Sequence, residues 1–159
     1  MNEDLQLIYQ SYEALHSENN ESIAHATQVL QTFFDNPNSI TLFLSIISNS
    51  TNNFFQQEAL INLKTIFSLY FQQYPPEIIK LIQNTLFSFF SSNTNQNIIP
   101  NITHLLAYIY SKTYDFQIFQ LFLQLLQSPD ASQLLSGLFL WIELSNFLIT
   151  PLKDRKSVV

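Results

Sequence analysis

One glycine, Gly137, occurs in the whole chain of 159 residues, and this scarcity restricts the fold more than any other feature. Sheets joined by tight turns need glycine where the backbone takes a positive φ, and phosphate-binding loops need it where the backbone approaches a ligand closely. Most of the six prolines stand where a helix would begin, because proline fits the first turn of a helix. The sequence therefore indicates helices joined by short polar turns.

Seven polar breaks divide the chain into eight helical segments. The breaks are HSENNES (16–22), DNPNS (35–39), SNSTNN (48–53), QYPPE (73–77), SSNTNQN (91–97), KTYD (112–115) and SPD (128–130). Between them, apolar residues recur at the spacing of one helix face, as at Ala59, Leu63, Ile66, Phe67 and Tyr70. Each segment is thus predicted to bury one face.

Alternate segments begin near Asp4, Pro37, Pro76 and Tyr114, which is a repeat of about 33–40 residues and close to the HEAT and armadillo range. This spacing predicts an all-α fold, a right-handed α-solenoid of about four HEAT-type antiparallel helix pairs over residues 1–150. A closed bundle of eight helices is the alternative.

The charge of the chain excludes one large class of partners. It carries 12 acidic and 6 basic residues, for a formal net charge of −6, and its first 63 residues contain seven carboxylates and no lysine or arginine. A nucleic-acid surface needs clustered basic residues to replace the counterions of the phosphates. Basic proteins are the better-matched partners.

Residues for catalysis or cofactor binding are not arranged in any pattern that predicts a site. A single glycine cannot build a phosphate-binding or dinucleotide-binding loop, and the absence of cysteine removes disulfides and thiolate metal sites. His25 follows Glu21 by four residues, which indicates a solvated pair more than two metal ligands, and His104 is expected at a helix interface. The chain is therefore not expected to be an enzyme, and no catalytic, metal or cofactor residue is predicted.

The apolar stretch LLSGLFLWIELSNFLI (134–149) is the one segment that resembles a membrane span. It is 16 residues long and contains Glu143, whereas a spanning helix needs about 20 apolar residues, so a buried core helix is the prediction. The first residues, MNEDLQ, are acidic where a targeting presequence would be basic. We therefore expect a protein of the cytoplasm and nucleus that does not insert into membranes.

Residues 24–64, AHATQVLQTFFDNPNSITLFLSIISNSTNNFFQQEALINLK, resemble the N-terminal domain of the importin-β (karyopherin) superfamily. The residues that carry this resemblance are Ala26, Leu30, Pro37, Leu42, Leu44, Ala59, Leu63 and Lys64. The end of the chain is similar to the exportin branch typified by exportin seven, in which a long helix runs into a P-L-x-x-x-R-K segment. Pro151, Leu152, Arg155 and Lys156 match that segment.

The resemblance implies a nuclear transport receptor module that acts by binding proteins. Its expected partners are a Ran-type small GTPase in the GTP form, Phe-Gly nucleoporins of the nuclear pore, and protein cargo, with shuttling through the nuclear envelope. Lys64 and the basic cluster Lys153, Arg155 and Lys156 are the candidate protein-binding residues. Residues 151–159 are expected to form a basic tail that begins a turn towards further repeats.

Alternatives remain open both for these candidate residues and for the chain as a whole. Lys64 stands in the apolar segment ALINLKTIF, where a lysine normally extends its amine from the edge of a buried face without binding anything. The chain as a whole is either a fragment or shortened paralogue of a transport receptor, a HEAT-type scaffold without a transport role, or a truncation without function.

Overall fold

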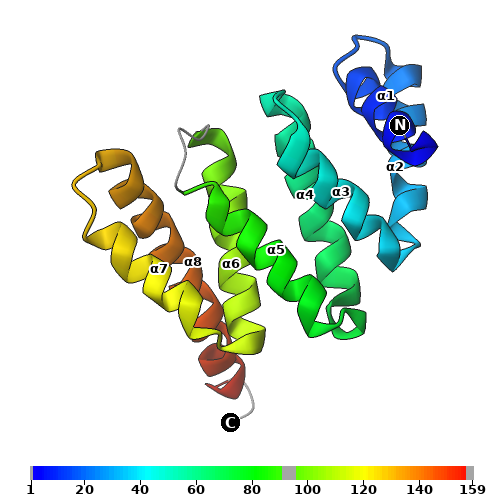
Figure 1. Cartoon of the computed structure of the whole chain (residues 1–159). Helices are drawn as coiled ribbons and strands as arrows, with labels where there is room; N and C mark the ends of the chain where they lie inside the picture. Colours follow the sequence, from blue (N-terminus) through cyan, green and yellow to red (C-terminus); the bar gives the residue numbers. More distant parts are fainter. Residues whose placement is uncertain (1, 91–95, 157–159) are drawn as a thin grey trace. The chain divides into compact units, whose positions relative to one another are not determined.

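The computed structural model describes residues 2–90 and 96–156, and the side chains of the last helix only as far as residue 147. Within these residues there are eight α-helices, three short 3-10 helices and no strand, which confirms the all-helical prediction (Figure 1). The α-helices are α1 (Glu3–Leu15), α2 (Asn20–Phe34), α3 (Ile40–Asn49), α4 (Asn53–Tyr70), α5 (Pro76–Ser88), α6 (Ile99–Thr113), α7 (Phe116–Leu126) and α8 (Ala131–Lys156). The 3-10 helices are Pro37–Ser39, Phe71–Gln73 and Gln96–Ile98.

Asparagine and aspartate side chains start many of these helices. The side-chain oxygens of Asn2, Asn19 and Asn52 accept a hydrogen bond from the backbone N–H two residues later, each at 2.9 Å, at the starts of α1, α2 and α4. Asp115 does the same for the N–H of Gln117 at the start of α7, also at 2.9 Å. Such caps satisfy backbone donors that have no partner inside the helix, so the polar breaks in the sequence fix where helices begin.

Contacts between residues divide the chain into two compact units, Met1–Pro75 and Pro76–Val159. The boundary falls inside the predicted break QYPPE, between two consecutive prolines. The right-handed solenoid over residues 1–150 stays a prediction, and so does its alternative, the closed bundle.

The Met1–Pro75 unit consists of two helix pairs, α1 with α2 and α3 with α4, and α1 also packs against α3 and α4. Its core is lined by fully buried side chains that include Tyr12, Phe43 and Phe67. Two tyrosine hydroxyls fix the end of α4 to the turn between the pairs: Tyr70 donates to the Phe34 carbonyl at 2.7 Å, and Tyr74 donates to the Pro37 carbonyl at 3.0 Å.

In the Pro76–Val159 unit, α6 packs against α5, α7 and α8 and forms the centre of the unit. Its side chains Ile102, Leu106 and Ile109 are fully buried. The close contact between α7 and α8 explains why residue 137 is glycine, because a Cβ atom there would lie 3.0 Å from the Cβ of Leu125 on α7. The two helices can therefore approach each other closely at this point.

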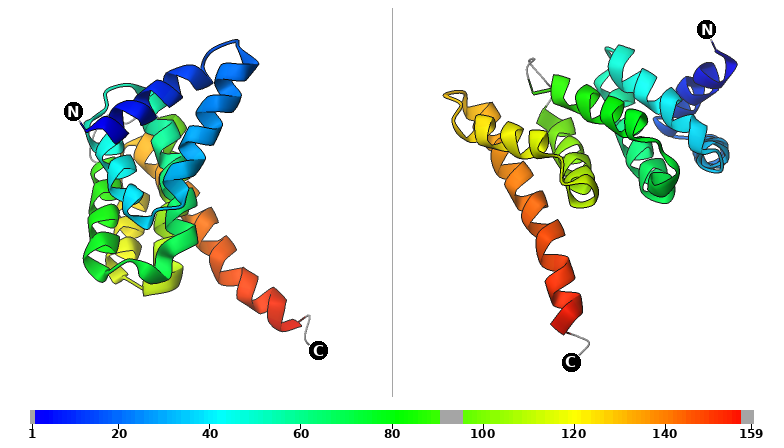
Figure 2. Two further views of the ribbon diagram at one scale, coloured as in Figure 1. Left: turned by 90° about the vertical axis from the view of Figure 1, so that its right-hand side faces the viewer. Right: turned by 60° about the horizontal axis from the view of Figure 1, so that its bottom comes forward.

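The turn predicted after residue 150 does not begin there, because α8 continues through Pro151 to Lys156 and projects beyond α7 (Figure 2). Proline removes one backbone hydrogen bond from a helix but does not forbid the helix. The residues after Pro151 include Leu152, Lys153 and Arg155, which have good helix propensity. Residues 157–159, the rest of the predicted tail, lie outside the described residues.

Candidate protein-binding surfaces

The two units differ sharply in charge. Met1–Pro75 contains seven carboxylates and one lysine, whereas Pro76–Val159 contains five acidic and five basic residues. The whole formal charge of −6 therefore resides in the first unit. A charge imbalance of this size on one unit attracts basic surfaces over a distance of about one Debye length.

Three of these carboxylates stand at the corner between α1 and α2. Glu13 lies in the last turn of α1, Glu18 in the connecting turn and Glu21 in the first turn of α2, and all three side chains are exposed. Glu21 also lies near the positive end of the α2 dipole, which stabilises its charge. We call Glu13, Glu18 and Glu21 the α1–α2 acidic corner.

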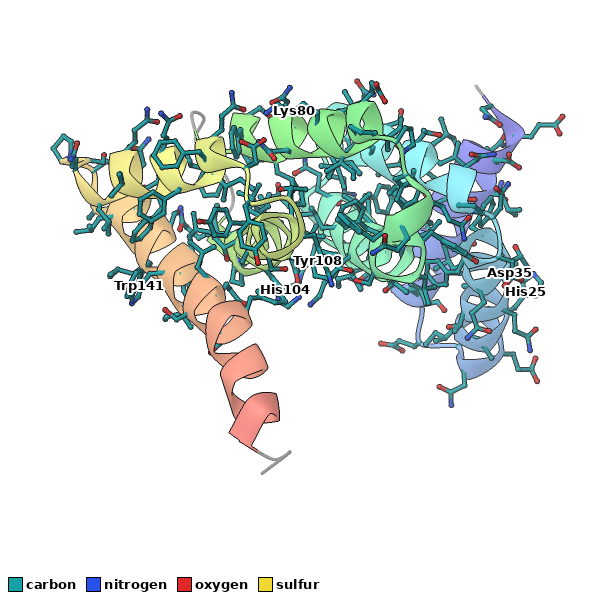
Figure 3. All side chains as sticks on the ribbon, turned by 90° about the horizontal axis from the view of Figure 1, so that it is seen from below. His25, Asp35, Lys80, His104, Tyr108 and Trp141 are labelled. Carbon is teal, nitrogen blue, oxygen red and sulfur yellow. The ribbon has the colours of Figure 1, made fainter. Side chains whose placement is uncertain are left out.

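The neighbouring residues attach this corner to α4. The centroids of the His16 and Phe54 rings lie 3.5 Å apart. Burial raises the pKa of Glu58 on α4, and the nearby His16 has the opposite, smaller effect of lowering it. His25, which the sequence placed next to Glu21, is exposed (Figure 3). Among the described residues no group of three or more His, Asp or Glu side chains could hold a metal ion.

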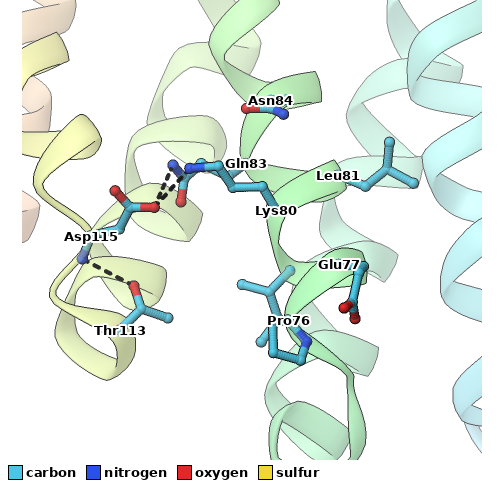
Figure 4. Close-up of a pocket in the computed structure, with 9 residues that line it drawn as sticks. Pro76, Glu77, Lys80, Leu81, Gln83, Asn84, Thr113 and Asp115 are labelled. Atoms are coloured by element: carbon cyan, nitrogen blue, oxygen red, sulfur yellow. Dashed lines mark hydrogen bonds and ion pairs between the residues drawn. The ribbon is translucent and has the colours of Figure 1, made fainter.

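A concave pocket of about 830 Å³ lies in the Pro76–Val159 unit, between α5 and the turn that joins α6 to α7 (Figure 4). At its wall, the Lys80 amine donates to Asp115 Oδ2 at 2.9 Å and also to the side-chain oxygen of Gln117. The Gln83 amide donates to the same Asp115 oxygen at 3.1 Å. Sequence reasoning missed this network, although the aspartate in the KTYD break signals a helix cap.

The network fixes α5 to the start of α7. Partial burial alone would raise the pKa of Asp115, but hydrogen bonds from Lys80, the Gln117 backbone and Gln83 outweigh that effect and lower its pKa below the ordinary value. The carboxylate is therefore ionised, and the Lys80 amine is engaged with two acceptors. These contacts link residues of α5 to the first turn of α7, so the arrangement suits a structural role.

His104 on α6 lies at a helix interface, as the sequence predicted. Its Nδ1 is 3.0 Å from Glu143 Oε2 on α8, and its ring contacts Phe147, as does the ring of Tyr108. This contact explains why the apolar stretch 134–149 contains one carboxylate. No helix in the described part of the chain is long and apolar enough to span a membrane.

The prediction that residues 134–149 form a buried core helix is only half correct. Ser136, Leu140 and Leu144 are buried, but Leu138 and Trp141 on the other side of α8 are exposed. Trp141 points away from α8 in Figure 3. Periodicity predicted the helix, yet the segment is apolar on nearly every side, so it could not show which side is covered.

The predicted protein-binding residues fall in different units. Lys64 lies on α4 in Met1–Pro75, half-buried beside the fully buried Leu63, in keeping with a lysine at the edge of a core. Lys153, Arg155 and Lys156 belong to the last turns of α8 in the other unit, and their side chains lie outside the described ones.

No protein-family model, no curated protein and no solved structure matches this chain. The likeness to the importin-β superfamily therefore stays a prediction from the sequence.

Proposed function

We propose that the chain acts by binding other proteins and not by catalysis, as a module of a nuclear transport receptor. The observation that carries this proposal is the concentration of negative charge in Met1–Pro75, which includes the exposed α1–α2 acidic corner. Paired helices that expose one charged face are a common architecture for protein recognition. The charge suits a basic protein and repels nucleic acid.

The partner that fits both this charge and the sequence resemblance is a Ran-type small GTPase in its GTP form. Phe-Gly nucleoporins and protein cargo are the other proposed partners, and the proposed location is the cytoplasm and nucleus, including the nuclear pore. Lys64, Lys153, Arg155 and Lys156 remain candidate contacts in this proposal.

The test is a binding measurement with the immobilised full chain and the purified GTPase, loaded with a GTP analogue or with GDP. We expect selective retention of the GTP form, and binding that weakens from about 50 mM to about 200 mM salt, because contacts between exposed charges are screened. Equal binding of both forms, or binding of neither, contradicts the transport proposal.

Two charge variants locate the contact. Glu18→Gln/Glu21→Gln removes two carboxylates from the α1–α2 acidic corner, and Glu77→Gln/Asp130→Asn removes two exposed carboxylates from the other unit. The pairs are matched, since Glu21 and Glu77 both stand in the first turn of a helix. We expect the first variant to slow association several-fold and the second to leave it unchanged.

A scaffold without a transport role is the second candidate, and the exposed apolar side of α7 and α8 favours it. Apolar patches larger than a few hundred Å² commonly mark protein-binding surfaces. A scaffold predicts partners that bind regardless of nucleotide state, so the same experiment separates the two functions.

A further inference from the structure

The second pair of helices in the Pro76–Val159 unit, α7 and α8, exposes eight large apolar side chains. We call this set of side chains the α7–α8 apolar face, and its exposed members are Phe116, Leu123, Leu126, Leu134, Leu135, Leu138, Trp141 and Ile142. On α8, Leu134, Leu138, Trp141 and Ile142 recur at helical spacing and so share one side of the helix.

Contacts between rings join the α7 part of this face to the α8 part. Along α7, the centroids of Phe116 and Phe119 are 5.8 Å apart, and those of Phe119 and Phe122 are also 5.8 Å apart. Phe122 then stacks on Trp141 of α8 at 5.5 Å with an interplanar angle of 18°. Phe122 is buried and Trp141 is 54% exposed, so this stack packs the two helices together and places the Trp141 ring at the edge of the exposed side chains.

The exposed area of this face is close to that of a protein interface. Phe116 is 60% exposed, Trp141 54% and Ile142 53%, and the other members are each more than a third exposed. Scaled from about 150–250 Å² for a large side chain, the eight residues expose on the order of 600 Å² of side-chain surface. A standard interface buries about 800 Å² on each partner, so this face and a narrow polar rim would suffice.

The face carries no charge among its described side chains. All residues of α7 are uncharged, and the one carboxylate among the described side chains of α8, Glu143, pairs with His104. The Pro76–Val159 unit also has equal numbers of acidic and basic residues. Two copies could therefore bring these faces together without local charge repulsion, and no basic residue of the face attracts an acidic partner or an anionic membrane.

We propose that the α7–α8 apolar face binds the same face of a second copy of this chain, forming a symmetric dimer. Homodimer interfaces are richer in apolar and aromatic residues than other interfaces and depleted of charge at their centre, as this face is. In a two-fold dimer each residue meets the same surface on the partner, so an uncharged surface complements itself. The acidic corner that carries the proposed function lies in the other unit, so loss of GTPase binding and loss of self-association can be told apart by experiment.

The test is sedimentation velocity of the full chain from about 1 to 100 µM, together with tryptophan fluorescence of the same samples. Trp141 is the only tryptophan in the chain, so its emission reports on this face alone. We expect the dimer fraction to rise with concentration, and the emission to move to shorter wavelength as the ring leaves water. A monomer at the highest concentration, with water-exposed emission, overturns the proposal.

Leu138→Glu is the diagnostic variant, because it places a carboxylate in the middle of the face. Leu138 is 47% exposed, so the change should leave the monomer folded but weaken self-association at least about tenfold. Leu69→Glu is the matched control, since Leu69 is an exposed leucine of α4 in the other unit, and it should leave self-association unchanged. Far-ultraviolet circular dichroism checks that both variants are folded.

Three outcomes assign the face to something else and overturn the proposal. A dimer that persists in Leu138→Glu has its interface elsewhere. Aggregates without a fixed size show non-specific adhesion. A blue shift of Trp141 emission on adding phosphatidylcholine vesicles to a chain that remains monomeric assigns the face to a lipid surface.

Discussion

Replacing Tyr12 by phenylalanine removes the acceptor of a buried hydrogen bond in the Met1–Pro75 unit. The Tyr12 side chain is fully buried, and its hydroxyl accepts a hydrogen bond from the Asn62 amide on α4 at 2.8 Å. Asn62 is itself buried, so in Tyr12→Phe its N–H would lose this partner without gaining water. A buried donor left without a partner costs about 1–3 kcal/mol.

Asn62→Leu tests the same bond from the other side. It keeps a similar volume but leaves the Tyr12 hydroxyl without its donor, so we again expect a loss of about 1–3 kcal/mol. The double variant Tyr12→Phe/Asn62→Leu replaces both partners by apolar groups, which can be nearly neutral. The double variant should therefore be more stable than the sum of the two single losses predicts, by about 1–3 kcal/mol.

Urea unfolding followed by far-ultraviolet circular dichroism measures the free energy of unfolding of all four proteins. In thermal scans, a loss of about 1 kcal/mol lowers the Tm by about 4–8 °C for a domain of about 60–100 residues, the size class of Met1–Pro75. Losses that add within about 0.5 kcal/mol would show that the two side chains do not interact and would refute the reasoning.

The titration of the Tyr12 hydroxyl gives a second test, at alkaline pH. Burial raises the pKa of the Tyr12 hydroxyl well above its usual range, against the hydrogen bond from Asn62, and Glu58 and Tyr9 raise it further. A raised pKa in the folded state means that this contribution to stability is complete below about pH 10 and is lost as the pH rises above it. Tyr12→Phe should lack this part of the alkaline loss.

Four further predictions concern single sites. Asp115→Ala removes the cap of α7 and should cost about 1–2 kcal/mol. Because the pKa of Asp115 is lowered in the folded state, its contribution to the free energy of unfolding is present above about pH 4 and is lost as the pH falls through the lower folded value. Urea unfolding should therefore show a smaller difference between Asp115→Ala and wild type at about pH 3 than at about pH 7. An equal difference at both pH values contradicts this. Gly137→Ala gains about 1 kcal/mol of helix propensity, but crowding of the new methyl group against Leu125 should cost about 1–3 kcal/mol. We therefore expect the Tm to stay the same or fall, and a Tm that rises would refute the close packing of α7 and α8. Tyr114 has a φ of 53°, a left-handed backbone conformation that glycine adopts more easily than tyrosine. Tyr114→Gly should therefore raise the free energy of unfolding by up to about 1 kcal/mol in chemical denaturation. A loss would show that the contact between the Tyr114 and Tyr110 rings contributes more than the backbone strain costs. Burial raises the pKa of Tyr74 to about 12, with a smaller contribution from Tyr70, so ultraviolet absorbance should show that Tyr74→Phe has lost a late-titrating phenol. The stability that Tyr74 contributes below about pH 10 should be lost towards pH 12, so the alkaline loss should be smaller in Tyr74→Phe than in wild type.

The sequence by itself determined the helices and most of their starts. Caps such as Asn19 and Asn52 act within two or three residues of the chain, and apolar spacing acts within one turn, so both can be read without knowing the rest of the fold. The wrong boundary came at Pro151, where local preference indicates a break but the helix continues. The charge asymmetry was also readable, because it depends on composition alone.

Only the tertiary structure decided which helix faces meet and which stay exposed. The Lys80–Asp115 pair joins residues 35 positions apart, and the Phe122–Trp141 stack joins two helices, so neither follows from a local pattern. Gly137 was visible as the single glycine, but the reason for it required both helices in place, because Leu125 of α7 leaves no room for a side chain there. Local preferences are set by neighbours along the chain, whereas a binding surface consists of the side chains that packing leaves uncovered.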